Sequence, residues 1–110
     1  FKIIHCDEFQ SQGIDKIVDR IRKRVGNNPL YLSIDIDVLD PAYAPGTGTP
    51  EIAGMTSREI VNVIRGLSGM NIISADVVEV APAYDHAEVT SLAAATIVYE
   101  LTNLFAKVKR

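Results

Sequence analysis

Apolar runs that suit β-strands alternate along this chain with apolar residues at helical spacing. Residues 2–5, 30–36 and 72–80 predict three strands, and the last two are apolar enough to be buried on both faces. Helices are predicted at 14–25, from 57 to about 69, and after 85 as far as Val108. This alternation predicts an α/β fold whose parallel sheet is covered by helices on both faces, with all strands ending at one edge.

The composition is that of one small globular domain, since 47% of the 110 residues are hydrophobic and 23% are charged. A net charge of −3 indicates no basic face, so we expect no nucleic-acid partner. The longest apolar stretch, 92–99, is too short to span a bilayer, so we expect no membrane association. The single cysteine excludes a disulfide within this chain and a Cys-rich zinc site.

A long loop at 38–55, rich in proline and glycine, separates the second predicted strand from the next helix. Thr56 and Glu59 have the spacing of a capping box, which predicts that the helix begins there. Loops of this length in compact domains are often functional. Asp40, which precedes Pro41, is expected to fix the loop rather than to bind metal.

Asp35 and Asp37 are the first candidates for chemistry. Residues two apart on a strand point to the same face, so we expect both carboxylates to project together from the end of the strand. Two like charges are costly to ionise side by side, and a divalent cation such as Mg²⁺ or Mn²⁺ would offset that cost. The alternative is that both carboxylates are solvated or cap the next loop, and the spacing alone leaves both interpretations open.

Glu79 stands at the end of the following predicted strand. On a parallel sheet it would emerge at the same edge as Asp35 and Asp37, where α/β proteins bind ligands. A carboxylate in that place could pair with a guanidinium group. An ordinary carboxylate at a strand end is the alternative.

Two segments carry a resemblance to a known family. The first, within 33–54, reads Ser-Ile-Asp-Ile-Asp-Val-Leu-Asp-Pro and then Ala-Pro-Gly-Thr-Gly-Thr-Pro; the second, 76–82, reads Asp-Val-Val-Glu-Val-Ala-Pro. Both resemble signature segments of the ureohydrolases, the arginase/agmatinase family, and the similarity covers most of the chain. It implies a three-layer α/β/α fold with a parallel sheet, of which residues 1–110 would form the C-terminal portion of a single domain.

The resemblance also implies roles for four residues. Asp35 and Asp37 would be ligands of a binuclear manganese (Mn²⁺) centre, with Asp35 bridging the two ions. Glu79 would hold the guanidinium of the substrate, and Thr49 would line the pocket beside it. The family reaction adds a metal-bridging hydroxide to the guanidinium carbon and releases urea and an amine.

Residues 81–90 indicate the branch of the family. They resemble agmatinases and related guanidino-acid hydrolases, whereas arginases usually have Asn-Pro after the Glu-Val pair. We therefore expect agmatine as the substrate, cleaved to putrescine and urea, with other guanidino compounds as alternatives. Because similar proteins are oligomeric, we also expect a homo-oligomer.

The family's other metal ligands lie in a Gly-Gly-Asp-His segment and an Asp-Ala-His-x-Asp segment, and this sequence has neither. His5 and His86 lie in no matching motif, so we expect neither to bind metal, while Asp85 either approaches the far end of the substrate or caps the last helix. These residues are then expected to form the last third of a larger enzyme domain and to be inactive alone. The alternative is a non-catalytic fold remnant that acts as a binding or regulatory module.

Overall fold

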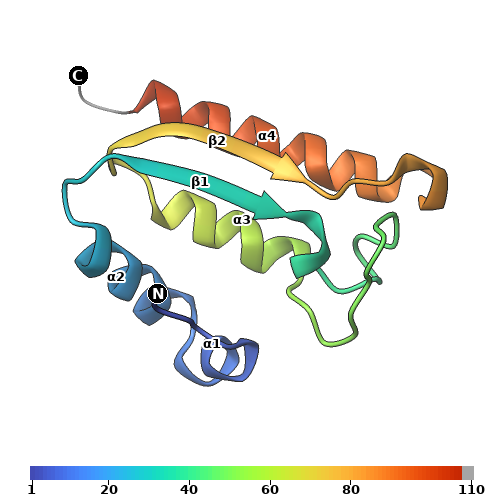
Figure 1. Ribbon diagram of the computed structural model, residues 1–110, viewed down its shortest axis with the longest axis horizontal. Helices are drawn as coiled ribbons and strands as arrows, with labels where there is room; N and C mark the ends of the chain where they lie inside the picture. The colour runs from blue at the N-terminus through green and yellow to red at the C-terminus, as the bar shows by residue number, and fades with distance from the viewer. Residues whose placement is uncertain (108–110) are drawn as a thin grey trace.

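The chain folds as a two-stranded parallel sheet with helices packed on one face (Figure 1). The structure, a computed structural model, describes residues 1–107. The elements in chain order are α1 (Cys6–Gln12), α2 (Ile14–Val25), β1 (Leu30–Asp35), the 3₁₀ turn η1 (Ile36–Val38), α3 (Ser57–Gly66), β2 (Ile72–Val78), the 3₁₀ turn η2 (Pro82–Tyr84) and α4 (Val89–Ala106). The expected parallel pairing of β1 and β2 is confirmed, so both strands end at the same edge.

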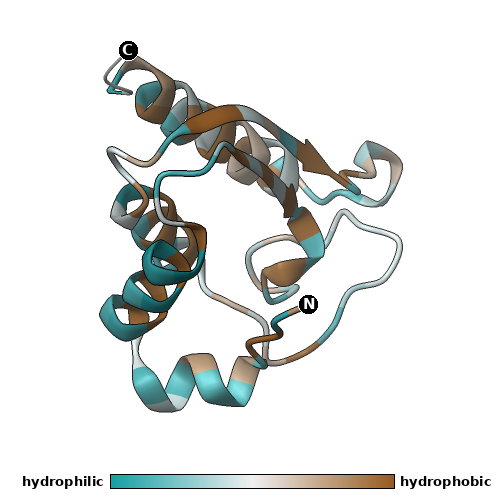
Figure 2. Cartoon of the chain, turned by 60° about the vertical axis from the view of Figure 1, so that its left-hand side comes forward, coloured by the Kyte–Doolittle hydropathy of each residue, from teal (hydrophilic) through white to brown (hydrophobic). Residues whose placement is uncertain are grey.

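The two faces of the sheet differ in what covers them. Leu32 and Ile34 of β1 lie beside Ala75 and Val77 of β2 and belong to the core, which α3 and α4 close. The opposite face carries the half-exposed Tyr31, whose hydroxyl donates a hydrogen bond to the carboxylate of Asp76. Colouring by hydropathy shows the strands mostly brown and the outer surfaces of α1 and α2 mostly teal (Figure 2). Within residues 1–107, helices therefore cover one face of the sheet, where the sequence predicted cover on both.

The helix signals read from the sequence are confirmed. At the end of α2, Gly26 adopts φ +59° and its N–H donates to the Arg22 carbonyl. α3 begins with the predicted capping box, in which the Thr56 hydroxyl accepts from the Glu59 N–H at 3.1 Å and the Glu59 carboxylate accepts from the Thr56 N–H at 2.7 Å. α4 ends at Ala106, and the predicted end at Val108 lies outside the described residues.

The prediction of a strand at residues 2–5 is wrong for the described structure. A strand needs a neighbour for its backbone N–H and C=O groups, and β1 and β2 pair only with each other. The chain instead turns into α1, where the Phe9 N–H donates to the His5 carbonyl. No pattern in the sequence indicated α1, because Phe9 is its only buried residue and no apolar stripe runs along it.

Two side-chain contacts hold the helix layer together. The guanidinium of Arg22 on α2 donates to the carbonyls of Gly66 and Ser68 at the end of α3, at 2.6–2.9 Å. Val18 of α2 packs so closely on Gly66 that a Cβ there would lie 2.7 Å from its Cγ2. The absence of a side chain at position 66 therefore sets how closely the two helices approach.

Among residues 1–107, α4 is the one helix that is long and apolar enough to cross a membrane. The apolar stretch 92–99 identified in the sequence is only a part of this helix. Its inner face belongs to the core, with Ile97 and Leu101 buried. On the same helix Glu100 is 7% exposed and accepts two hydrogen bonds, of 3.0 and 2.5 Å, from the Arg65 guanidinium of α3. One face of α4 thus packs in the core, and its buried carboxylate is paired with an exposed guanidinium of the neighbouring helix.

Candidate metal and substrate site

Asp35 and Asp37 lie at the carboxyl edge of the sheet, as predicted, but for a different reason. β1 ends at Asp35, and Asp37 is already in the turn η1, so the alternation of a strand does not relate the two side chains. The turn brings them together instead, because the Asp37 N–H donates to Asp35 Oδ1 at 3.1 Å. A carboxylate that accepts from the residue two positions later closes an Asx turn, which is the local cause of the bend.

The surroundings of Asp35 favour a cation. Burial raises the pKa of its carboxyl group, and the hydrogen bond from the Asp37 N–H opposes that rise only in part. The negative charges of Asp37 and Glu79 raise the pKa further. A carboxylate whose ionised form is disfavoured by burial and by neighbouring negative charges lies in an environment in which a positive charge is stabilised.

Glu79 reaches this edge from β2. It follows Val78, which lies opposite Asp35 in the register of the sheet, and its side chain is exposed. Its backbone adopts φ +65°, in the left-handed region that residues with a side chain seldom occupy. β2 is therefore shorter than the predicted 72–80, and this turn directs the chain away from the strand at Glu79.

Thr49 is the fourth candidate, and it comes from the long loop. Its hydroxyl donates to Asp37 Oδ2 at 2.8 Å, so this exposed threonine lies beside the carboxylates. The hydrogen bond brings the middle of loop 38–55 to the end of β1. The structure thus joins Asp35, Asp37 and Thr49 by hydrogen bonds and places Glu79 at the same edge of the sheet, while their roles as ligands and substrate contacts stay predictions.

The donor set suits part of a metal site. Asp35 and Asp37 offer adjacent carboxylate oxygens of the kind that hard divalent cations prefer. Among residues 1–107, no three His, Cys, Asp or Glu side chains lie close enough together to hold a metal ion. His5 precedes α1 and His86 precedes α4, and neither histidine belongs to such a group.

Comparison with known proteins identifies the family, since the sequence model of the arginase family matches residues 1–103. The chain belongs to the arginase family. It is 60% identical over 107 residues to putative agmatinase 1 of Schizosaccharomyces pombe, covering 97% of this chain and 27% of that protein. It is 50% identical to the agmatinase of Enterobacter sp. strain 638, covering 92% of this chain and 33% of that protein.

Solved structures agree with the arginase-family fold. A hypothetical agmatinase from Burkholderia thailandensis superposes with a TM-score of 0.92 at 46% identity, over 96% of this chain and 33% of that one. Proclavaminate amidinohydrolase from Streptomyces clavuligerus superposes with a TM-score of 0.96 at 42% identity, over 98% and 37% of the two chains. The predicted arginase-like α/β fold is confirmed, and the chain spans about a quarter to a third of the curated relatives it matches.

The base of the long loop in this arginase-family chain is fixed by backbone contacts and by Asp40. Leu39 and Met55 form a parallel bridge, with the Met55 N–H donating to the Val38 carbonyl at 2.8 Å. The Asp40 carboxylate accepts from the N–H groups of Ala42 at 2.8 Å and Ala53 at 3.0 Å. Asp40 therefore fixes the loop, as the sequence predicted.

Asp85 caps α4, which decides between the two interpretations left open by the sequence. Its carboxylate accepts from the N–H groups of Thr90 and Ser91 at 2.9 Å and from the Ser91 hydroxyl at 3.0 Å. Burial raises the pKa of Asp85, but these hydrogen bonds and one from the Thr90 hydroxyl outweigh it and hold the pKa well below its usual range. Thr90, which is fully buried, was not singled out in the sequence. It follows Asp85 by five residues, and that spacing forms no distinctive pattern.

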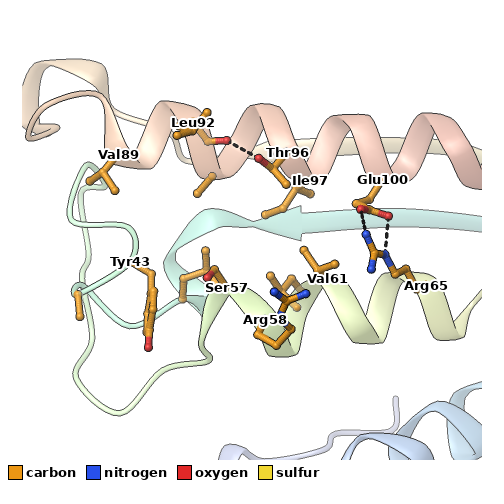
Figure 3. A pocket seen from close by; sticks show the side chains of 14 residues that line it. Tyr43, Ser57, Arg58, Val61, Arg65, Val89, Leu92, Thr96, Ile97 and Glu100 are labelled. Atoms are coloured by element: carbon orange, nitrogen blue, oxygen red, sulfur yellow. Dashed lines mark hydrogen bonds and ion pairs between the residues drawn. The ribbon is translucent and has the colours of Figure 1, made fainter.

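A cavity of about 380 Å³ lies elsewhere, between α3 and α4 (Figure 3). Tyr43, Val61 and Ile97 contribute to its walls, and the ion pair of Arg65 and Glu100 lies at one end. None of the four candidate site residues lines it. This cavity is therefore not the candidate metal and substrate site, which lies at the open carboxyl edge of the sheet.

Proposed function

We propose that the protein hydrolyses a guanidino compound, with agmatine as the substrate and putrescine and urea as the products. The observation that carries this proposal is the placement of Asp35, Asp37 and Glu79 at the carboxyl edge of the sheet, where burial and the charges of Asp37 and Glu79 raise the pKa of Asp35. The named agmatinases that match at 48–50% identity support the choice of substrate.

Asp35 and Asp37 would hold manganese. When bound, such ions act as Lewis acids and make a hydroxide nucleophile available near neutral pH. The protein's part is to fix the two carboxylates. The Asp37 N–H holds Asp35 Oδ1 at 3.1 Å, and the Thr49 hydroxyl holds Asp37 Oδ2 at 2.8 Å.

Glu79 would receive the guanidinium of the substrate. A carboxylate matches a guanidinium through two parallel hydrogen bonds, which orient the planar group as well as attract it. Thr49 would contact the same group from the long loop. Hydrolysis then forms a bond between a water oxygen and the guanidinium carbon and breaks the bond from that carbon to the substituted nitrogen, so that urea and a protonated amine leave.

The experiment uses the intact gene product with manganese and measures urea release from agmatine, arginine and 4-guanidinobutyrate. We expect agmatine to give the largest kcat/KM. Asp35→Asn and Asp37→Asn should lower the bound manganese per chain, whereas Glu79→Gln should keep the metal and raise KM for agmatine. Asp19→Asn, at an exposed position of α2, is the matched control and should leave metal content and kinetics unchanged.

A second candidate function is that of a non-catalytic binding or regulatory module. It is favoured by one observation, namely that residues 1–107 contain no group of three metal-binding side chains. The same experiment separates the two proposals, because an intact protein that retains no manganese and releases no urea from any of the three substrates would support the module. We further propose that the intact protein is a homo-oligomer, which light scattering of the purified protein tests directly.

A further inference from the structure

One residue, Gly46, connects the two loops that form the candidate site. The Gly46 N–H donates to the hydroxyl oxygen of Thr90 at 2.8 Å, and the Gly46 carbonyl accepts from the Ala81 N–H at 2.8 Å. Thr90 lies in the first turn of α4 and is fully buried. The long loop is therefore held on one side by α4 and on the other by the loop that follows β2.

Each of these loops carries one of the proposed substrate contacts. Thr49 follows Gly46 by three residues and is bonded to Asp37. Glu79 precedes Ala81 by two residues and has the left-handed backbone described above. The two hydrogen bonds of Gly46 thus fix the loop segment that carries Thr49 relative to the chain segment that carries Glu79.

The backbone of Thr90 is itself held by Asp85. The Thr90 N–H donates to Asp85 Oδ1 at 2.9 Å, which sets the first turn of α4. Gly46 packs directly on Asp85, since a Cβ at position 46 would lie 2.9 Å from the Asp85 Cα. A buried N–H that loses its acceptor cannot turn to water, so the Gly46 N–H depends on Thr90.

We propose that Thr90 is a positioning residue, whose hydroxyl sets the separation between Thr49 and Glu79 and so determines how tightly the site holds a guanidinium. The proposal deepens the hydrolase function proposed above and rests on it. Thr90 itself contacts neither substrate nor metal in this scheme. Its effect passes through Gly46, whose N–H donates to the Thr90 hydroxyl oxygen and whose carbonyl accepts from the Ala81 N–H.

The test compares Thr90→Val, which removes the hydroxyl at nearly the same volume, with Thr90→Ser, which keeps it, both in the intact protein. Thr90→Val should raise KM for agmatine by about tenfold, because the Gly46 N–H loses its acceptor and Asp85 loses a donor, with little change in kcat or in bound manganese. Thr90→Ser should restore KM to near the unmodified value. Thr102→Val is the matched control, since Thr102 lies on the same helix and its hydroxyl bonds only to the Val98 carbonyl of that helix.

A second variant covers the case in which Thr90→Val does not fold. Gly46→Ala keeps Thr90 but pushes the long loop away from Asp85, and it should raise KM in the same way. An unchanged KM in folded Thr90→Val or Gly46→Ala protein overturns the proposal. So does a Thr90→Ser variant as impaired as Thr90→Val, because the hydroxyl would then not be the group that matters.

Amide hydrogen exchange separates failure of this proposal from failure of the proposed function. Thr90→Val should speed exchange in segments 44–49 and 79–84 relative to Thr102→Val. If the unmodified protein releases no urea from any guanidino substrate, the hydrolase function fails, and faster exchange confined to these segments still supports the link through Gly46. Equal exchange in the two variants would refute that link whether or not the protein is a hydrolase.

Discussion

Gly54 is the position where the structure predicts the largest effect of a single added methyl group. A Cβ at this residue would lie 2.5 Å from the Asp40 backbone nitrogen, 2.7 Å from the Leu39 carbonyl carbon and 2.9 Å from the Val38 carbonyl oxygen. All three are backbone atoms, so no side chain can rotate to make room. In Gly54→Ala, the two backbone segments at the base of the loop, around Leu39 and Met55, must therefore separate by several tenths of an ångström or more.

The separation breaks identifiable contacts. The Met55 N–H bonds to the Val38 carbonyl at 2.8 Å and the Asp40 N–H bonds to the Met55 carbonyl at 2.9 Å, and both lie beside the new methyl group. Losing two backbone hydrogen bonds costs about 1 kcal/mol each, and overpacking adds about 1–3 kcal/mol. We expect Gly54→Ala to lower the free energy of unfolding by about 3–5 kcal/mol, seen as a fall in Tm on the order of 10 °C for the intact protein.

Gly48→Ala provides the matched control in the same loop. No atom lies within 4 Å of a Cβ built at Gly48, so this variant should unfold within about 1 °C of the unmodified protein. The assay is thermal unfolding of the two variants side by side under one set of conditions. Equal Tm values for Gly54→Ala and Gly48→Ala would refute the reasoning, because the loop base would then be able to open without cost.

Three further predictions concern the helices. Gly66→Ala should lower the free energy of unfolding by about 1–3 kcal/mol, measured by denaturant titration, because its Cβ would meet Val18 Cγ2 at 2.7 Å. Asp85→Asn should lower Tm at neutral pH, and since the folded-state pKa of Asp85 is depressed, the difference from the unmodified protein should shrink in a pH series as the pH falls below about 4. Arg65→Met should lower Tm by leaving the buried carboxylate of Glu100 without its partner, and the double variant with Glu100→Leu should recover most of the loss.

Much of the fold could be predicted from the sequence where two independent signals agreed. α3 has both a capping box at Thr56 and an apolar face at Ile60 and Ile64, and it begins where predicted. α1 has neither signal, and it was missed. Residues 2–5 have the composition of a strand. A strand also needs an adjacent strand to pair with, and composition does not show whether one is present.

The sequence predicted where the candidate residues would lie but not how they are arranged. Asp35, Asp37 and Glu79 lie at one edge of the sheet, as a parallel arrangement requires. The strand alternation used to pair Asp35 with Asp37 does not apply, because the chain enters η1 between them. The bond from Thr49 to Asp37 and the role of Thr90 depend on how a long loop folds back, which local periodicity cannot show.

The backbone at Glu79 offers a final argument for the position of the site. A residue with a side chain in the left-handed region costs about 1 kcal/mol or more, and glycine would remove that cost. The strained turn is held two residues later by the bond from the Ala81 N–H to the Gly46 carbonyl, at 2.8 Å. Backbone strain of this kind is found most often where a side chain must point in a particular direction, and here the side chain is the carboxylate whose charge reaches Asp35. Ala53, Ala87 and Glu88 share this left-handed backbone, so it is the charge that reaches Asp35 that supports our proposal of a functional carboxylate at position 79.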